Sequence, residues 1–293
     1  MFKSRLEKVL FIKKLKNLPK EIFGGKYILV TSSIDPFFKN WGDDISTVIA
    51  QLINPSVRII PSKYSFNIFR KKEFLSVGSI ITWLTKPNTI IWGSGVQFPE
   101  DNIIYKGKEI KPLKVLAVRG PLTRDYLLKK NIDCPEIYGD PALLFPKYYK
   151  PNVEKKYKLG IIPHFKDKNS KVVKQILEDE NIHFIDIQNV TDWRTFINEV
   201  ASCEAVLSSS LHGIIVCDSY NVPNAWVEFD RKNLKRFTFN DYFMSVNKGM
   251  QEPKNLPETP TLEQLIKLTE DWKAPEIDLS PLLSVCPFIK NTK

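Results

Sequence analysis

Short apolar runs alternate with amphipathic segments along most of the chain. Apolar runs of about four to eight residues are typical of buried strands, and apolar residues that recur every three or four positions are typical of helices. The pattern predicts strands at 26–31, 57–61, 89–92, 115–118, 159–163, 183–187, 205–207 and 224–229. Helices are predicted at 45–52, 121–130, 170–178, 192–203, 212–220 and 261–272. Short strands that alternate with helices favour an α/β protein with parallel sheets.

This alternation is interrupted at residues 146–158, which are rich in Pro, Lys and Tyr. Such a shift in composition is typical of a linker, and a chain of 293 residues is long enough for two hydrophobic cores. We therefore predict an N-terminal domain over 1–150 and a second parallel α/β domain over 151–255. The segment 256–293 is expected to be a tail that packs back on the N-terminal domain.

The composition, with 43% hydrophobic and 26% charged residues, is that of a globular protein. The net charge of +10 favours an anionic partner, such as nucleic acid, a phosphorylated small molecule or an acidic lipid surface. Because no zinc-finger spacing, aromatic RNA-binding motif or basic region before heptads is found, we expect no nucleic acid partner. No apolar stretch approaches the roughly 20 residues of a membrane span, and no secretory signal is visible. These features predict a cytoplasmic protein, either free or peripheral at the inner membrane face.

The cysteines predict neither a metal site nor disulfides. Cys134, Cys203, Cys217 and Cys286 are scattered, without the paired spacing of a zinc site or a disulfide framework. We expect three of the four to be ordinary small core residues, since they stand beside apolar residues, and we expect no bound metal.

The first 20 residues carry seven Lys or Arg and a single Glu, beside an apolar stripe. A basic amphipathic helix of this kind can lie on an anionic membrane surface. It can equally pack on its own domain, with Phe2, Leu6 and Val9 buried. The sequence leaves both alternatives open.

The stretch SSSLHGIIVCDSYNVP, residues 208–223, marks the point where a strand becomes a buried helix. In open parallel sheets, ligands bind beyond the carboxyl ends of the strands, and the N-terminus of the following helix attracts anions. Ser209 and Ser210 can cap that helix or contact the ligand. His212 lies in the first turn, where an imidazole with a pKa near neutrality suits proton transfer. The alternative is that His212 satisfies a buried backbone carbonyl.

Four other strand ends carry candidate ligand-binding residues. Arg119 can bind a carboxylate or phosphate through two parallel hydrogen bonds. The alternative is that Arg119 forms a surface ion pair. Gly93 and Ser94 make a tight turn after a strand, Asp43 can orient a sugar hydroxyl or cap a helix, and His164 ends the first strand of the second half. A structural role is an equal alternative for His164.

Taken in order, six segments resemble the polysaccharide pyruvyltransferase family: 40–46 (NWGDDIS), 90–97 (IIWGSGVQ), 118–127 (VRGPLTRDYL), 138–144 (YGDPALL), 160–164 (GIIPH) and 208–223. The C-terminal SVCPF at 284–288 also fits. The resemblance implies two Rossmann-like domains that face each other across a cleft, as in GT-B glycosyltransferases. It also implies transfer of pyruvyl from phosphoenolpyruvate to a sugar or lipid-linked oligosaccharide of a bacterial surface polysaccharide, forming a cyclic ketal without a cofactor.

The resemblance assigns His212 as the catalytic acid and base. We expect donor binding at Arg119, Ser209, Ser210, Leu211, Gly213 and His164, and acceptor binding at Asp43, Gly93 and Ser94. Some family members have an arginine where this chain has Ser210, so one positive charge is missing from the expected donor site. Ser209, Ser210 and the helix N-terminus can take its place, or the donor can differ.

Two other functions fit the same residues. A GT-B-type glycosyltransferase with a nucleotide-sugar donor would share the fold and would need an acidic residue for the ribose, for which Glu228 is a candidate. A non-catalytic sugar-phosphate-binding protein would not need both His212 and Arg119.

Overall fold

The structure is a computed structural model that describes residues 4–33, 37–189, 191–229 and 235–289, without the side chain of Asp43. The chain forms two compact units. Unit 1 comprises residues 1–141 and 278–293, and unit 2 comprises residues 142–277. The predicted tail is thus divided, since 256–277 belong to unit 2 and only its last part belongs to unit 1. The residues of the proposed linker lie within unit 2.

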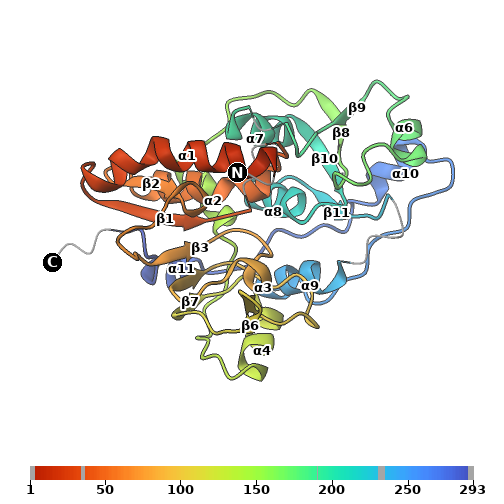
Figure 1. Ribbon diagram of the computed structural model, residues 1–293. Coiled ribbons are helices and arrows are strands. Elements are labelled where there is room, and N and C mark those ends of the chain that lie inside the picture. Colours follow the sequence, from red (N-terminus) through yellow and green to blue (C-terminus); the bar gives the residue numbers. More distant parts are fainter. Residues whose placement is uncertain (1–3, 34–36, 190, 230–234, 290–293) are drawn as a thin grey trace. The chain divides into compact units, whose positions relative to one another are not determined.

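Unit 1 is built on a five-stranded sheet in which every neighbouring pair is parallel (Figure 1). The strands follow the order β2 (Arg58–Pro61), β1 (Tyr27–Thr31), β3 (Glu73–Leu75), β4 (Thr89–Trp92) and β7 (Lys114–Ala117). The strand order therefore changes direction between β1 and β3, which makes this position the topological switch point of the sheet.

The helices of unit 1 are α1 (Arg5–Ile22), α2 (Trp41–Ile53), α3 (Ile81–Leu84), α4 (Pro121–Lys129) and α11 (Ser280–Ser284). A short 3-10 helix, η1 (Ser62–Tyr64), follows β2, and a hairpin of β5 (Ile104–Tyr105) and β6 (Lys108–Glu109) precedes β7. Pro121 occupies the first turn of α4, where its fixed φ suits a helix start. Asn40 caps α2 by accepting from the Gly42 N–H at 3.1 Å.

Unit 2 contains a four-stranded parallel sheet with the order β11 (Asn224–Trp226), β10 (Cys203–Ser208), β8 (Tyr157–Ile162) and β9 (Ile182–Phe184). Its switch point lies between β8 and β10, the first and third strands of the unit along the chain. The helices are α5 (Phe145–Tyr148), α6 (Lys171–Ile176), α7 (Trp193–Ala201), α8 (Leu211–Ser219), α9 (Arg236–Ser245) and α10 (Leu262–Lys267), and the 3-10 helix η2 (Pro141–Leu144) precedes α5.

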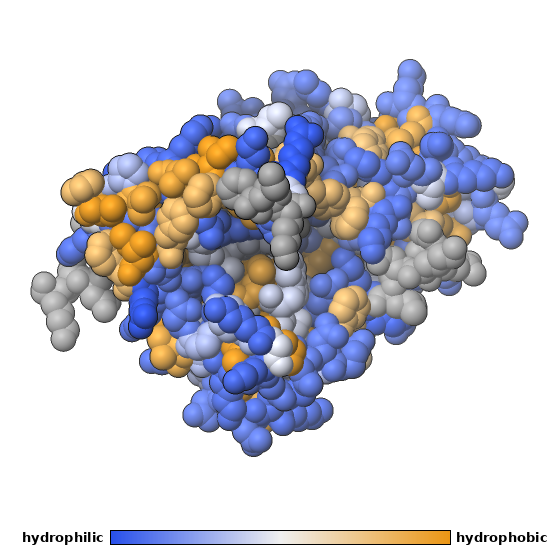
Figure 2. Space-filling model, in the orientation of Figure 1, coloured by the Kyte–Doolittle hydropathy of each residue, from blue (hydrophilic) through white to orange (hydrophobic). Residues whose placement is uncertain are grey.

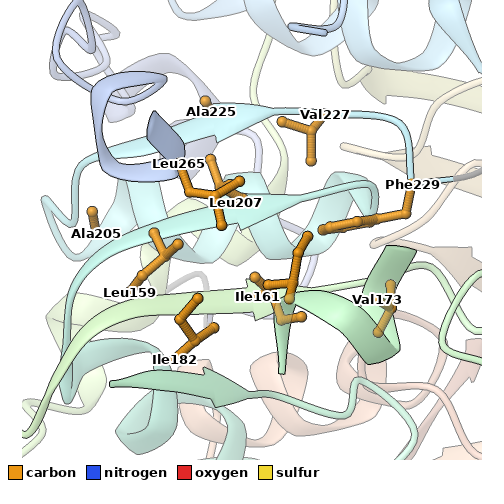
Figure 3. Packing of buried hydrophobic residues seen from close by; sticks show 11 residues of the cluster. Leu159, Ile161, Val173, Ile182, Ala205, Leu207, Ala225, Val227, Phe229 and Leu265 are labelled. Carbon is orange, nitrogen blue, oxygen red and sulfur yellow. The ribbon is translucent and has the colours of Figure 1, made fainter. Parts of the chain in front are cut away.

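Both faces of the unit 2 sheet are buried. On one face, Leu159, Ile161 and Leu207 pack with Leu265 of α10 and the apolar residues of α6 (Figure 3). The neighbouring residues of the same strands point to the opposite face, because side chains alternate along a strand. A helix packs there closely enough that a Cβ on Gly213 of α8 would lie 3.1 Å from the Ile162 side chain. Continuous apolar strands of this kind are typical of parallel sheets.

The predicted α/β class with parallel sheets is confirmed. The prediction missed β3, since its residues EFL are few and begin with a charge, and it made several elements too long, among them the strand predicted at 183–187, which ends at Phe184. The predicted strand 224–229 ends at Trp226, and the predicted helix 261–272 ends at Lys267. No helix within the described ranges is long and apolar enough to cross a membrane.

Candidate functional site

The carboxyl edge of the unit 2 sheet brings two segments together at its switch point. Ile162 of β8 pairs with Ser208 of β10, and the Ser209 N–H donates to the Ile162 carbonyl at 3.1 Å. His164 and Ser209 therefore leave the sheet side by side. This is where parallel sheets bind ligands.

A closed set of hydrogen bonds joins these two segments. The His164 N–H donates to Ser209 Oγ at 2.8 Å, and that hydroxyl donates to Asp167 Oδ2 at 2.9 Å. The Asp167 N–H donates to the His164 carbonyl at 2.7 Å, which closes the set. His164, Asp167 and Ser209 are only 6%, 2% and 4% exposed, so the network holds a fixed geometry away from water. Sequence reasoning did not find Asp167.

Lys235 contributes a positive charge at this edge. Its Nζ lies 3.0 Å from Nε2 of His164. Burial first, and then the charges of Lys235 and Lys166, lower the pKa of His164 from 6.5 to about 3. His164 is therefore neutral near pH 7, and its ring nitrogen accepts a hydrogen bond from the ammonium group. Lys235 was also missed, because it stands far from the recognised motifs, just before α9.

The serines at the start of α8 have different roles. Ser208 is fully buried, and its Oγ accepts from the Ser210 N–H at 3.0 Å. Ser210 is the N-cap residue of α8, but its side chain makes no capping hydrogen bond. The first N–H groups of α8 are thus not capped by the Ser210 hydroxyl, and they give this edge a partial positive charge.

In the first turn of α8, His212 is partly exposed, whereas Leu211 and Gly213 on either side are buried. A Cβ on Gly213 would lie 2.3 Å from Ser208 Oγ, so glycine allows the helix to pack directly on β10. Leu211 is 7% exposed and packs in the interior. Of these three residues, only His212 is partly exposed, and its Nε2 atom is buried.

Arg119 of unit 1 lies in the interior and is 0% exposed. Its Nη1 donates to Ser79 Oγ at 2.5 Å, and its Nη2 donates to the Val96 carbonyl at 3.1 Å. Gly95 leaves room for the guanidinium, since a Cβ there would lie 2.3 Å from Arg119 Cζ. A surface ion pair is therefore excluded, and Arg119 connects the loops that follow β3 and β4. Its predicted contact with a donor stays a prediction.

The predicted acceptor residues also follow strands of unit 1 or lie in its helices. Gly93 has a φ of +90°, and a Cβ there would lie 2.3 Å from Cδ of Pro141. Ser94 is 0% exposed, and its hydroxyl donates to the Ser76 carbonyl at 3.0 Å. Asp43 is the third residue of α2, and Asn40 is the N-cap residue of that helix. The Asp43 side chain lies outside the described part of the chain.

Three further hydroxyls lie at the switch point of unit 1. Ser32 and Ser33 follow β1, and Ser76 follows β3. Their Oγ atoms are buried and have no hydrogen-bond partner among the residues that the structure describes. Buried polar atoms are normally paired, so these hydroxyls are candidates to bind a polar ligand or water. Ser76 was missed because β3 was not predicted, whereas Ser32 and Ser33 follow the predicted strand 26–31 and were overlooked.

Asp218, the single acid in the apolar run of residues 214–219, organises the far end of α8. Its two oxygens each lie 2.7 Å from Lys248 Nζ. Its carboxylate also accepts from the Tyr242 hydroxyl at 2.9 Å and from Asn224 and Trp272 at 2.8 Å each. A cavity of about 430 Å³ has Asn224, Lys248 and Trp272 among its lining residues. A lone acid within an apolar segment is the sequence signal of such a buried polar network.

Glu228, the candidate ribose ligand of a glycosyltransferase, is already paired. Its Oε1 lies 3.7 Å from Nη1 of Arg236, and its side chain is 11% exposed. To bind a ribose, Glu228 would have to give up this ion pair. Within the described ranges, no three His, Cys, Asp or Glu side chains gather into a group that could hold a metal ion.

A model of the polysaccharide pyruvyl transferase family matches residues 37–231. Uncharacterized protein L143 of Acanthamoeba polyphaga mimivirus is 33% identical over 218 residues, which are 72% of this chain and 72% of that protein. The succinoglycan biosynthesis protein ExoV of Rhizobium meliloti (strain 1021) is 22% identical over 241 residues, which are 80% of this chain and 69% of ExoV. A solved structure of a Klebsiella pneumoniae protein without assigned function has 16% identity and a TM-score of 0.43, covering 82% of this chain and 94% of that one.

The matched region includes Arg119, His164, Ser209 and His212. The resemblance that was read from the motifs is therefore confirmed by an independent comparison over more than half of the sequence. The chain belongs to the polysaccharide pyruvyl transferase family.

Proposed function

We propose that this protein transfers the pyruvyl unit of phosphoenolpyruvate to a sugar of a surface polysaccharide precursor, free or lipid-linked. The family supports a transferase that acts on polysaccharide. The observation that carries the proposal is the joint placement of Lys235, His164 and Ser209 beside the start of α8. A cation and the N-terminus of a helix that the Ser210 side chain does not cap suit a donor with a phosphate and a carboxylate.

Lys235 is the cation that we assign to the donor. Some family members have an arginine at the position of Ser210, and this chain lacks that charge. His164 stays neutral because its pKa is lowered to about 3, so it holds the Lys235 ammonium without adding a competing charge. In this proposal Ser209 is a positioning residue, since its hydroxyl already lies between the His164 N–H and Asp167.

His212 is proposed as the acid and base. As an acid it protonates the methylene carbon of phosphoenolpyruvate, which becomes the methyl group, and a cation develops at the neighbouring carbon. One sugar hydroxyl adds there and gives its proton to the neutral imidazole. A second hydroxyl then displaces phosphate from the same carbon. The C–O bond to phosphate breaks with its electron pair as the new C–O bond forms, and the proton of the hydroxyl leaves with phosphate, which completes the ketal. These steps require no metal ion or cofactor.

The acceptor is proposed to bind unit 1 through groups that recognise hydroxyls. Ser32, Ser33 and Ser76 provide buried oxygens without partners among the described residues, and a sugar can donate to them or accept from them. They extend the predicted acceptor residues Asp43, Gly93 and Ser94. Since phosphoenolpyruvate is a cytoplasmic metabolite, the proposed reaction takes place in the cytoplasm.

The proposal is tested by incubating the purified protein with phosphoenolpyruvate and a panel of free and lipid-linked sugars. Phosphate release is measured together with the mass of the acceptor, which should increase by one pyruvyl ketal. Phosphate release without acceptor modification, or turnover of nucleotide sugars in place of phosphoenolpyruvate, would contradict the proposal.

The role of Lys235 is tested with Lys235→Gln, and Lys174→Gln on the exposed side of α6 is a matched control for loss of one charge. Because a hydrogen bond to a charged group contributes about 1.5–3 kcal/mol, the Kd for phosphoenolpyruvate should rise about 10- to 100-fold in Lys235→Gln. The control should bind like the unmodified protein. Equal affinities in both variants would remove Lys235 from the donor site.

A further inference from the structure

Helix α1 turns its apolar side to solvent. Phe11, Leu15 and Ile22 form one stripe along it and are 39%, 45% and 44% exposed. Figure 2 shows hydrophobic side chains gathered over this helix. Phe23, directly after α1, is 84% exposed. A surface helix of a globular protein normally has the opposite orientation, with its apolar stripe on the core.

The inner side of α1 is held by polar contacts. Lys13 Nζ donates to the Tyr64 hydroxyl at 3.1 Å, and the Asn17 side chain donates to the Tyr64 carbonyl at 3.0 Å. Glu21 is 2% exposed and accepts from the Phe66 N–H at 3.1 Å. Leu6 and Val9 are only partly buried. The two alternatives for the N-terminus are thus compatible, because α1 packs on unit 1 and still presents an apolar face.

A neighbouring loop extends this face. Its side chains Phe66, Ile68 and Phe69 are 36%, 45% and 56% exposed. The Phe66 ring packs edge-on against the Phe11 ring, with 5.9 Å between the ring centroids. Exposed apolar side chains on two elements in contact form a patch, and such patches mark interaction sites.

The loop is ordered by its own hydrogen bonds. The Asn67 side chain accepts from the Lys71 N–H at 2.7 Å and donates to the Lys71 carbonyl at 3.0 Å. Asn67 and Arg70 both adopt a φ of 48°, which is costly for residues other than glycine. This strained turn holds Ile68 and Phe69 outward, and strain that keeps apolar side chains in water points to a binding role.

The charges around the patch identify the partner. Lys8, Lys16 and Lys20 lie on the exposed side of α1, and Arg70 and Lys72 are exposed in the loop. On the exposed side of α1 within residues 5–22, Glu7 is the acidic residue. We propose that the patch formed by α1 and residues 66–72 docks unit 1 on a lipid bilayer that contains anionic lipid. Its apolar side chains enter the headgroup region while the cations contact lipid phosphates and carboxylates. Two copies of the patch would bring like charges together, which disfavours a dimer through this face.

Vesicle flotation tests this docking without any turnover, so its result is independent of the proposed reaction. The probes are vesicles of phosphatidylcholine alone and with phosphatidylserine added, each at low and high salt. The unmodified protein should float with the anionic vesicles and should be released at high salt, where screening shortens the reach of charges to about 3 Å at 1 M. Lys8→Gln/Lys16→Gln should bind about 30-fold more weakly, since each cation near the surface contributes roughly 1 kcal/mol.

Ile68→Ser/Phe69→Ser removes two exposed side chains of the loop and should weaken binding by about 10-fold or more. The matched control is Leu128→Ser/Lys129→Gln on α4, which changes one exposed apolar residue and one exposed cation elsewhere on unit 1. The control should bind like the unmodified protein, with equal thermal unfolding in all variants. Absence of flotation, or equal losses in control and loop variants, would overturn the proposal. So would a dimer in solution that only the loop variant dissociates.

Discussion

Replacing Asp218 tests how far burial decides the strength of an ion pair in unit 2. The Asp218 side chain is 0% exposed, and that of Lys248 is 8% exposed. Their closest atoms lie 2.7 Å apart. Asp218→Ala leaves the Lys248 ammonium in a largely buried position without its counter-charge. It also removes the acceptor for three neutral donors, from Tyr242, Asn224 and Trp272.

Breaking a buried pair by removing one partner costs about 3–5 kcal/mol, because the remaining charge is poorly solvated. We therefore expect Asp218→Ala to lower the free energy of unfolding by about this amount, or the Tm by roughly 10 °C. Urea and thermal unfolding followed by circular dichroism measure both quantities. Asp218→Ala/Lys248→Met should recover part of the loss, since it removes the stranded ammonium group as well.

The matched control is the Lys158–Glu204 pair, which has the same 2.7 Å separation but side chains that are 55% and 50% exposed. Water screens this pair, so Glu204→Ala should change stability by less than about 1 kcal/mol. The reasoning is refuted if Asp218→Ala and Glu204→Ala cost the same, or if the double variant is less stable than Asp218→Ala alone.

Three further predictions concern the sheet edges. His212→Asn should unfold like the unmodified protein but lose about 10²–10⁴-fold in turnover of phosphoenolpyruvate; turnover within a few-fold of normal would exclude the acid and base role. The pKa of His164 is lowered from 6.5 to about 3, so the unfolded chain binds a proton that the folded one does not. The free energy of unfolding should therefore decrease as the pH drops from 6.5 towards 3, and it should decrease less steeply in His164→Gln. Urea titrations at several pH values measure both slopes. Arg119→Met removes two buried hydrogen bonds and should lower the Tm, whereas a change in donor affinity at constant Tm would indicate a direct contact with donor instead.

The sequence located the unit 2 edge because parallel strands end at a common edge of their sheet. His164, Ser209 and His212 each follow or begin a correctly predicted element, so their placement needed only the alternation of strands and helices. Lys235 and Asp167 could not be found in this way. They reach the edge from segments that no periodic pattern connects with it, and only tertiary packing brings them there.

The orientations of the helix at residues 5–22 and of the Arg119 side chain also could not be predicted from the sequence. The periodicity of residues 5–22 indicates a helix with an apolar stripe, but it does not say which side contacts the protein. The polar contacts of Asn17 and Glu21 decide that. Similarly, an arginine that follows a strand can lie either at an anion-binding site or in the interior, and the sequence does not distinguish the two. Gly95 leaves the space that makes Arg119 an interior residue, and this depends on a loop distant in the sequence.

Helix α8 is fixed at both ends, by the contact of Gly213 with Ser208 at its start and by the Asp218 network at its finish. His212 is therefore carried on a preorganised support, and its position does not depend on a substrate being present. A ligand at this edge would order few additional backbone dihedrals in α8, so little conformational entropy would be lost there on binding. Slow amide hydrogen exchange along α8 in the free protein would be the signature of that rigidity, and ligand should slow it little further.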